Sequence, residues 1–219
     1  MDQEQKNKIT LAATVLIFVG LMFVAWQSEQ RIYEVNGQLV VRADQHDPDA
    51  LVFAWRDGID VPMARHFADA YDEYRGEASR IIIELNSTGG SLYEGGQVIK
   101  VIDRMKRTHK VDTRVGPRRI CLSMCVPIFL QGEERSAAAT ARFMFHEPTL
   151  TDAITGKPVK EPEFEKEFSS QRFVDRYFVN SPMDPDWRDD LIAEWRGRDI
   201  WRSGKQLVDE GSNIVTVLN

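Results

Sequence analysis

Residues 80–91 read RIIIELNSTGGS, a β-branched apolar run followed at once by a turn with two adjacent glycines. Such a run is typical of a strand that is buried on both faces of a parallel sheet. The apolar residues of 94–105 then recur at helical spacing, and 110–115 predicts the next strand. A strand, a glycine turn, a helix and a strand form a right-handed βαβ unit. The sequence therefore predicts an α/β domain with a largely parallel sheet.

Further elements flank this unit on both sides. Before it, the pattern predicts a hairpin over 31–41 around Asn36-Gly37, a strand over 50–55 and an amphipathic helix over 61–74. After it, we expect a helix over 123–130, a helix or strand over 137–145, an exposed loop over 148–162, helices over 163–178, 186–195 and 205–210, and a last strand over 214–218.

Length and charge restrict the classes of function. A chain of 219 residues has room for one domain that buries a full core without cross-links. A formal net charge of -6 gives no general attraction for nucleic acid, so we expect no nucleic-acid partner. The short basic cluster over 104–107, with Arg118 and Arg119 nearby, is interpreted as solvated charges of a helix and a loop.

An uncharged apolar segment lies near the N-terminus. The residues from Ile9 to Trp26 contain no charged side chain, and as a helix they would extend about 27 Å, close to the thickness of a bilayer core. A cleaved signal peptide is the alternative, but no small-x-small cleavage pattern follows the run. We expect a cytoplasmic tail over 1–8, a single-pass anchor over 9–26 and a folded domain over 27–219 outside the cytoplasm.

A serine and a histidine stand out as candidates for chemistry. Ser123 lies in the apolar segment ICLSMC, and His146 follows it 23 residues later at the end of another apolar run. Ser123 could simply cap a helix, and a lone histidine could simply be a core residue. Together they have the chemistry of a nucleophile and a general base. The backbone N–H groups of the glycine turn and of Met124 could then stabilise an oxyanion.

Metal and cofactor chemistry are not expected. No second histidine or carboxylate lies at ligand spacing from His146, and the glycine turn lacks the lysine of a phosphate loop.

Two cysteines flank the serine, Cys121 and Cys125. On one helix they would share a face at a separation that a disulfide can span, but they could equally be two small buried side chains.

The three motifs together indicate a family. STGG after an apolar strand, Ser-Met at a helix start and His-Glu-Pro about two dozen residues later resemble the Clp protease proteolytic subunit over 81–148. With the anchor and the Cys-x-Ser-x-Cys motif, the chain is similar to the predicted periplasmic Clp-protease-like proteins of bacteria. The resemblance implies a ClpP/crotonase-like ββα spiral, Ser123 as nucleophile, His146 as base, and an oxyanion hole made by the N–H groups of Gly90 and Met124.

The resemblance also implies a third residue, an acid that orients the histidine. An alignment without gaps puts Trp195 at that position, so Glu194 and Asp199 are the candidates. The helices over 164–195 would form the handle through which subunits of the family pair, which implies a homo-oligomer.

We therefore expect a membrane-anchored serine endopeptidase-like hydrolase that acts on peptides or proteins. Two alternatives use the same fold. One is a catalytically silent binding or scaffold domain. The other is a crotonase-type acyl-coenzyme A enzyme, which uses paired backbone donors but needs no serine nucleophile.

Overall fold

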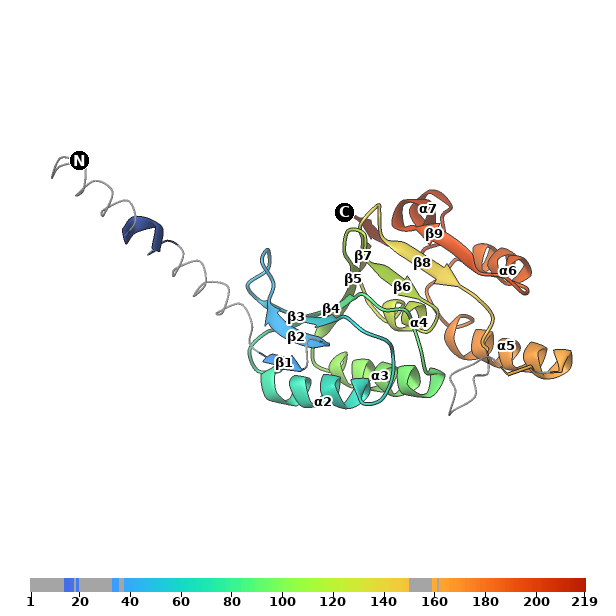
Figure 1. Ribbon diagram of the computed structural model, residues 1–219, viewed down its shortest axis with the longest axis horizontal. Helices are drawn as coiled ribbons and strands as arrows, with labels where there is room; N and C mark the ends of the chain where they lie inside the picture. Colours follow the sequence, from blue (N-terminus) through green and yellow to red (C-terminus); the bar gives the residue numbers. More distant parts are fainter. Residues whose placement is uncertain (1–13, 18, 20–32, 36–37, 150–158, 161) are drawn as a thin grey trace, which may run out of the picture.

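The computed structural model describes residues 14–17, 19, 33–35, 38–149, 159–160 and 162–219 (Figure 1). In chain order the elements are β1 (Tyr33–Val35), β2 (Leu39–Ala43), β3 (Ala50–Trp55), α2 (Met63–Tyr74), β4 (Arg80–Leu85), α3 (Leu92–Met105), β5 (Lys110–Val115), β6 (Ile120–Leu122), α4 (Cys125–Phe129), β7 (Arg135–Ala137), β8 (Arg142–Phe145), α5 (Glu163–Tyr177), α6 (Pro185–Glu194), β9 (Ile200–Ser203), α7 (Gly204–Asp209) and β10 (Val217–Leu218).

Two sheets organise the domain. The larger has the order β1-β2-β3-β4-β5-β7-β10, and the smaller has the order β6-β8-β9. In the larger sheet, β1, β2 and β3 pair antiparallel, whereas the strands from β3 to β10 are all parallel. This arrangement confirms the predicted α/β domain with a largely parallel sheet. The predicted hairpin is present as β1 and β2, although its turn residues 36–37 lie outside the described residues.

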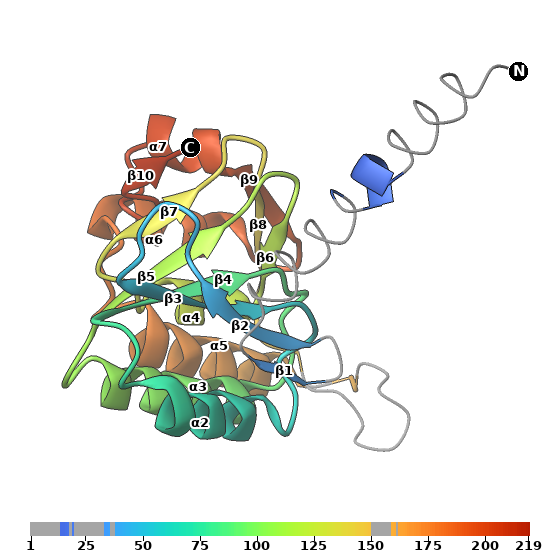
Figure 2. The same cartoon turned by 90° about the vertical axis from the view of Figure 1, so that its left-hand side faces the viewer.

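The main core lies between the larger sheet and its helices. Phe53 and Ile83 on the sheet, Phe67 on α2 and Ile102 on α3 are fully buried in one cluster. Figure 2 shows α2, α3 and α5 on the same side of this sheet. The short helix α4 contacts β4 of the larger sheet and both β6 and β8 of the smaller one, so it joins the two sheets.

The opposite face of the larger sheet is only partly apolar. Ile82 belongs to a second, small buried cluster, as the prediction of a strand buried on both faces requires. Glu84 on the same face is half-buried and forms ion pairs with Arg42 at 3.1 Å and Arg114 at 2.9 Å. The prediction is therefore confirmed for the isoleucines of β4, while Glu84 of the same strand is held in ion pairs.

The structure corrects several predicted elements. The helix expected over 123–130 begins only at Cys125, because Ser123 and Met124 form a turn. The segment 137–145 contains the end of β7 and then β8, and the last strand is shortened to Val217–Leu218. The short strands β6 and β9 were not expected. Each is held by pairing with β8, a partner that local sequence does not reveal.

The larger helices agree with expectation within two residues. The predicted helices over 61–74, 94–105, 163–178, 186–195 and 205–210 correspond to α2, α3, α5, α6 and α7. Of the predicted anchor over 9–26, the structure describes only 14–17 and 19, which are helical, and the rest lies outside the described residues. Among the residues described, no helix is long and apolar enough to cross a membrane.

The C-terminal segment is fixed by one buried arginine. The Arg135 guanidinium donates to the backbone carbonyls of Asn213 and Ile214 at 2.9 Å each and of Gly132 at 3.0 Å. Burial lowers the pKa of Arg135 below its ordinary value. These bonds secure the residues that lead into β10 at the edge of the larger sheet.

Candidate active site

Ser123 occupies a sharp turn between β6 and α4. Its φ angle of 53° is left-handed, a conformation that costs a non-glycine residue roughly 1–3 kcal/mol and persists only where the surroundings impose it. The Ser123 N–H donates to Met144 O at 2.9 Å, and the Ser123 carbonyl accepts from Val126 N at 2.9 Å. The expected helix-start serine is therefore a turn residue, and Met124 is the residue that precedes the helix.

His146 lies directly against this serine. It follows the last residue of β8, and its Nε2 atom is 2.8 Å from Ser123 Oγ. Both side chains are half-buried, so the pair is partly shielded from water and still reachable. The structure brings together the two residues that the sequence proposed as nucleophile and base.

The protonation of His146 suits a base. Burial lowers the pKa of His146 below its ordinary value of 6.5, while the negative charges of Asp199 and Glu147 oppose that shift. The imidazole is therefore neutral at pH 7. When Nε2 accepts a hydrogen bond from the Ser123 hydroxyl, the proton of the neutral ring resides on Nδ1.

The glycine turn is hydrogen-bonded to the serine segment. Ser87 N donates to Ile120 O at 2.9 Å, and Leu122 N donates to Ser87 O at 3.0 Å. Gly89 has a φ of 84°, and a Cβ atom built on it would lie 2.5 Å from Leu122 O and 2.8 Å from Ser123 Cβ. Only glycine can occupy this position beside the serine.

Two backbone N–H groups at this turn have no protein acceptor among the described residues. Ile59 N donates to Gly89 O, and Ile59 O accepts from Ser91 N, both at 2.8 Å. The Gly90 N–H takes no part in these two hydrogen bonds. In the part of the chain that the structure describes, neither Gly90 N–H nor Met124 N–H donates to another protein group. A Cβ on Gly89 would lie 3.2 Å from Met124 N, so the glycine turn lies beside the backbone of the serine turn.

The residues at and near the expected position of the orienting acid have different surroundings. Trp195 is 2% exposed and packs against Phe173 and Phe178 at ring-centroid distances of 6.3 and 6.0 Å, so it belongs to the core. Glu194 is paired with Arg202 at 3.0 Å. Asp199 is the candidate whose charge acts on His146, although among the described residues no hydrogen bond joins the two.

The residue after the histidine ties the site to two other elements. Glu147 Oε2 lies 2.6 Å from Lys166 Nζ of α5 and accepts from Gly197 N at 3.0 Å, in the loop between α6 and β9. Burial raises the pKa of Glu147, but the Lys166 ammonium and the Gly197 N–H outweigh it and hold that pKa below its ordinary value.

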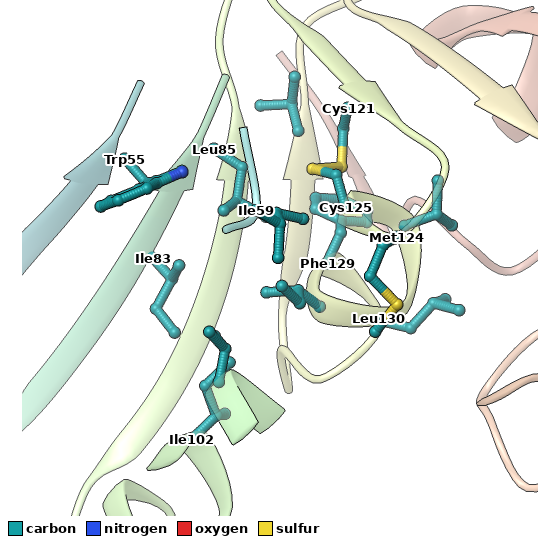
Figure 3. Packing of buried hydrophobic residues seen from close by; sticks show 14 of the residues in the cluster. Trp55, Ile59, Ile83, Leu85, Ile102, Cys121, Met124, Cys125, Phe129 and Leu130 are labelled. Atoms are coloured by element: carbon teal, nitrogen blue, oxygen red, sulfur yellow. A yellow bond between two sulfur atoms is a disulfide. The ribbon is translucent and has the colours of Figure 1, made fainter. Parts of the chain in front are cut away.

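Cys121 and Cys125 form a disulfide, with their Cα atoms 5.2 Å apart. The sequence left this pairing open and placed both residues on one helix face. In the structure Cys121 is in β6 and Cys125 is the first residue of α4, so the bond spans the turn that carries Ser123. Figure 3 shows the joined sulfur atoms beside the apolar side chains of Ile59, Met124 and Phe129.

Comparison with known proteins places the fold. No protein-family model and no curated protein match this sequence. Of 721 solved chains with a matching structure, one is a mutant of ClpP1 from Listeria monocytogenes, with a TM-score of 0.59 and 19% sequence identity. The match covers 77% of this chain and 90% of that chain. At this identity the likeness shows the fold alone, and it confirms the fold that the three motifs implied: the chain has a ClpP-like fold.

Proposed function

We propose that this protein is a serine hydrolase of the endopeptidase type. The observation that carries the proposal is the 2.8 Å contact between Ser123 Oγ and His146 Nε2, in a turn where the N–H groups of Gly90 and Met124 are unused among the described residues. A nucleophile, a neutral base and two fixed donors are the parts that acyl transfer requires.

The proposed reaction follows from these positions. Ser123 Oγ attacks the substrate carbonyl carbon while His146 Nε2 takes the hydroxyl proton. The carbonyl oxygen becomes an oxyanion that accepts hydrogen bonds from Gly90 N–H and Met124 N–H. The C–N bond then breaks as the imidazolium protonates the leaving amine. Water, deprotonated by His146, hydrolyses the acyl-enzyme and frees Ser123.

A catalytically silent scaffold is the second candidate. The observation that favours it is the exposed Asp199, which makes no hydrogen bond to His146 in the described part of the chain. Removing an orienting acid reduces the activity of a serine hydrolase without abolishing it, because the donors and the base remain. The 2.8 Å Ser123–His146 contact therefore favours the hydrolase.

Cleavage of peptides tests the two candidates. The full-length chain, purified in detergent, would be incubated with an unstructured protein such as casein, and new termini would be identified by mass spectrometry. We expect cleavage that falls by about 10³-fold or more in Ser123→Ala and His146→Ala. Cleavage that is unchanged in Ser123→Ala would exclude the proposed nucleophile. A folded protein without turnover supports the scaffold, and stabilisation by coenzyme A supports the crotonase-type alternative.

We further propose that the segment over 9–26 anchors the protein in a membrane, with the domain over 27–219 outside the cytoplasm. The uncharged apolar run supports the anchor, and the Cys121–Cys125 disulfide fits an oxidising compartment. In bacterial cells, a C-terminal epitope tag should be digested by external protease once the outer membrane is permeabilised. A tag protected until the inner membrane is lysed would contradict this orientation.

We also propose that the protein self-associates through α5, as the handle of a ClpP-like fold would. Phe164 and Phe168 on this helix are 70% and 64% exposed. Sedimentation of the full-length chain should show an oligomer that Phe164→Glu and Phe168→Glu dissociate. A monomer at micromolar concentration would contradict this proposal.

A further inference from the structure

The Cys121–Cys125 disulfide encloses the candidate nucleophile. Only Leu122, Ser123 and Met124 lie between the two cysteines, so the bond closes a ring of five residues around Ser123. One end of the ring is fixed in β6, where Cys121 pairs with Phe143 of β8. The other end begins α4. The cross-link therefore joins the strand and the helix whose junction sets the position of Ser123 Oγ.

The enclosed turn has a conformation that needs such support. Ser123 is left-handed at φ 53°, and a serine leaves this region unless neighbouring contacts hold it there. Its hydrogen bonds to Met144 O and from Val126 N are backbone contacts that a small rotation of the turn would lengthen. The disulfide adds a covalent limit to that rotation.

Burial of the sulfur atoms limits how the bond can be broken. Cys121 and Cys125 are both 0% exposed, packed in the main apolar cluster (Figure 3). An external thiolate can attack only when the turn opens, so reduction and displacement of Ser123 are linked.

We propose that the Cys121–Cys125 disulfide positions Ser123 for reaction, and that its reduction switches the site to a less reactive form. This inference rests on the proposed hydrolase function. In the switch, a thiolate of an external dithiol attacks one protein sulfur, and the S–S bond breaks to give a mixed disulfide. The second thiolate of the dithiol then displaces that sulfur. Two electrons pass to the protein, both cysteines leave as thiols after protonation, and the dithiol becomes a cyclic disulfide.

The test compares the oxidised and reduced forms of the full-length chain in detergent. Dithiothreitol is the reductant, and alkylation of two thiols verifies reduction by mass. Since the chain has only two cysteines, any effect of the reductant on thiols traces to this pair. The rate of labelling by a fluorophosphonate is measured well below the melting temperature of each form, together with the fraction of sites that label at completion.

We expect reduction to slow labelling by at least 10-fold, with the same fraction labelled and with recovery after oxidation by oxidised glutathione. The Cys121→Ala/Cys125→Ala variant should label slowly, and dithiothreitol should not change its rate of labelling. Ile128→Val is the control for general destabilisation, because Ile128 is also a buried residue of α4 but lies outside the ring. It should retain the oxidised rate. Equal rates in the two redox forms would overturn the proposal.

A second measurement is independent of turnover. The ¹⁵N signal of His146 Nε2, assigned by its loss in His146→Ala, should shift on reduction because Ser123 Oγ moves away from it. An unchanged signal would overturn the positioning role even if labelling slowed. If neither form labels, the hydrolase function fails, and the histidine signal alone decides whether the disulfide positions Ser123.

Discussion

Asp199 and His146 each lie one residue beyond the same end of the antiparallel ladder between β8 and β9. The last described pair of β8 and β9 is Phe145 with Ile200, and the same register carried one residue further places His146 opposite Asp199. The charge of Asp199 acts on the imidazole and raises its pKa against the effect of burial. The pairing of β8 with β9 thus brings a carboxylate near the proposed base from a position 53 residues away in the chain.

Replacement of this acid should weaken the base. In Asp199→Asn the imidazolium that forms during reaction loses its nearby negative charge, so we expect kcat to fall by about 10-fold. Glu194→Gln is the matched control, because Glu194 pairs with Arg202 and should leave kcat unchanged. Steady-state rates on one peptide substrate measure both. A loss confined to Glu194→Gln would identify the other candidate as the orienting acid.

The pH profile should report the buried histidine. His146 acts as a base only when neutral, and burial lowers its pKa below 6.5, so kcat/KM should hold down to pH 6.5 and fall only at lower pH. Asp199→Asn removes a charge that raises this pKa. In that variant, the decrease of kcat/KM at acid pH should therefore occur at a lower pH. A decrease at or above pH 7 in the unsubstituted protein would contradict a base of this kind.

Because the pKa of His146 is lowered in the folded protein, the free energy of unfolding should decrease at acid pH. The folded pKa of this histidine lies below its unfolded pKa, so the neutral ring contributes stability above about pH 6.5, and this contribution is lost as pH falls through the folded value. Chemical unfolding between pH 5 and 8 should show a steeper acid decline than in His146→Phe. Parallel declines in the two proteins would show that other groups dominate.

Gly89 should be indispensable to the serine turn. In Gly89→Ala the new methyl group meets Leu122 O and Ser123 Cβ in addition to the strain of a positive φ, so the turn must move. We expect a loss of about 2–4 kcal/mol in the free energy of unfolding, and activity reduced by more than 10-fold.

Gly211→Ala is the control for Gly89→Ala, because it introduces the strain of a positive φ without a steric clash. Gly211 has a φ of 70° and no atom within 4 Å of a Cβ built on it. Its substitution should cost about 1 kcal/mol and leave activity intact. Similar losses of activity in both variants would show that the contact of Gly89 with the serine turn is unimportant.

Arg135 should be a major stabiliser of the C-terminal segment. In Arg135→Met the carbonyls of Gly132, Asn213 and Ile214 lose their donor, which should cost about 2–4 kcal/mol. Arg65→Met removes an exposed pair with Asp69 and should cost less than about 1 kcal/mol. Calorimetric unfolding compares them, and an equal change in the two variants would contradict the assigned role.

Much of the fold follows from local pattern. The run at Arg80–Leu85 and the amphipathic spacing of Leu92–Met105 predict β4 and α3, since periodicity is a property of contiguous residues. The sequence also proposed that Ser123 and His146 act together, and the structure places their side chains in contact.

Other features depend on contacts that local sequence does not contain. β6 and β9 have three and four residues, and each exists through its ladder with β8. The left-handed φ of Ser123 is imposed by its neighbours and contradicts the ordinary preference of serine. That the charge of Asp199, and not that of Glu194, acts on His146 depends on the register of β9. The Ile-Trp pair at 200–201, with its high strand propensity, is the sequence signal that favours a strand there.

Covalent trapping of Ser123 tests directly whether this serine reacts as a nucleophile. The native full-length chain would be treated with a fluorophosphonate, digested and mapped by mass spectrometry. A reactive site predicts one phosphonyl group per chain, on the peptide that contains Ser123, with fluoride as the leaving group and with labelling lost in His146→Ala. A folded protein that takes up no phosphonyl group, or takes it up on another serine, would show that Ser123 is not a reactive nucleophile.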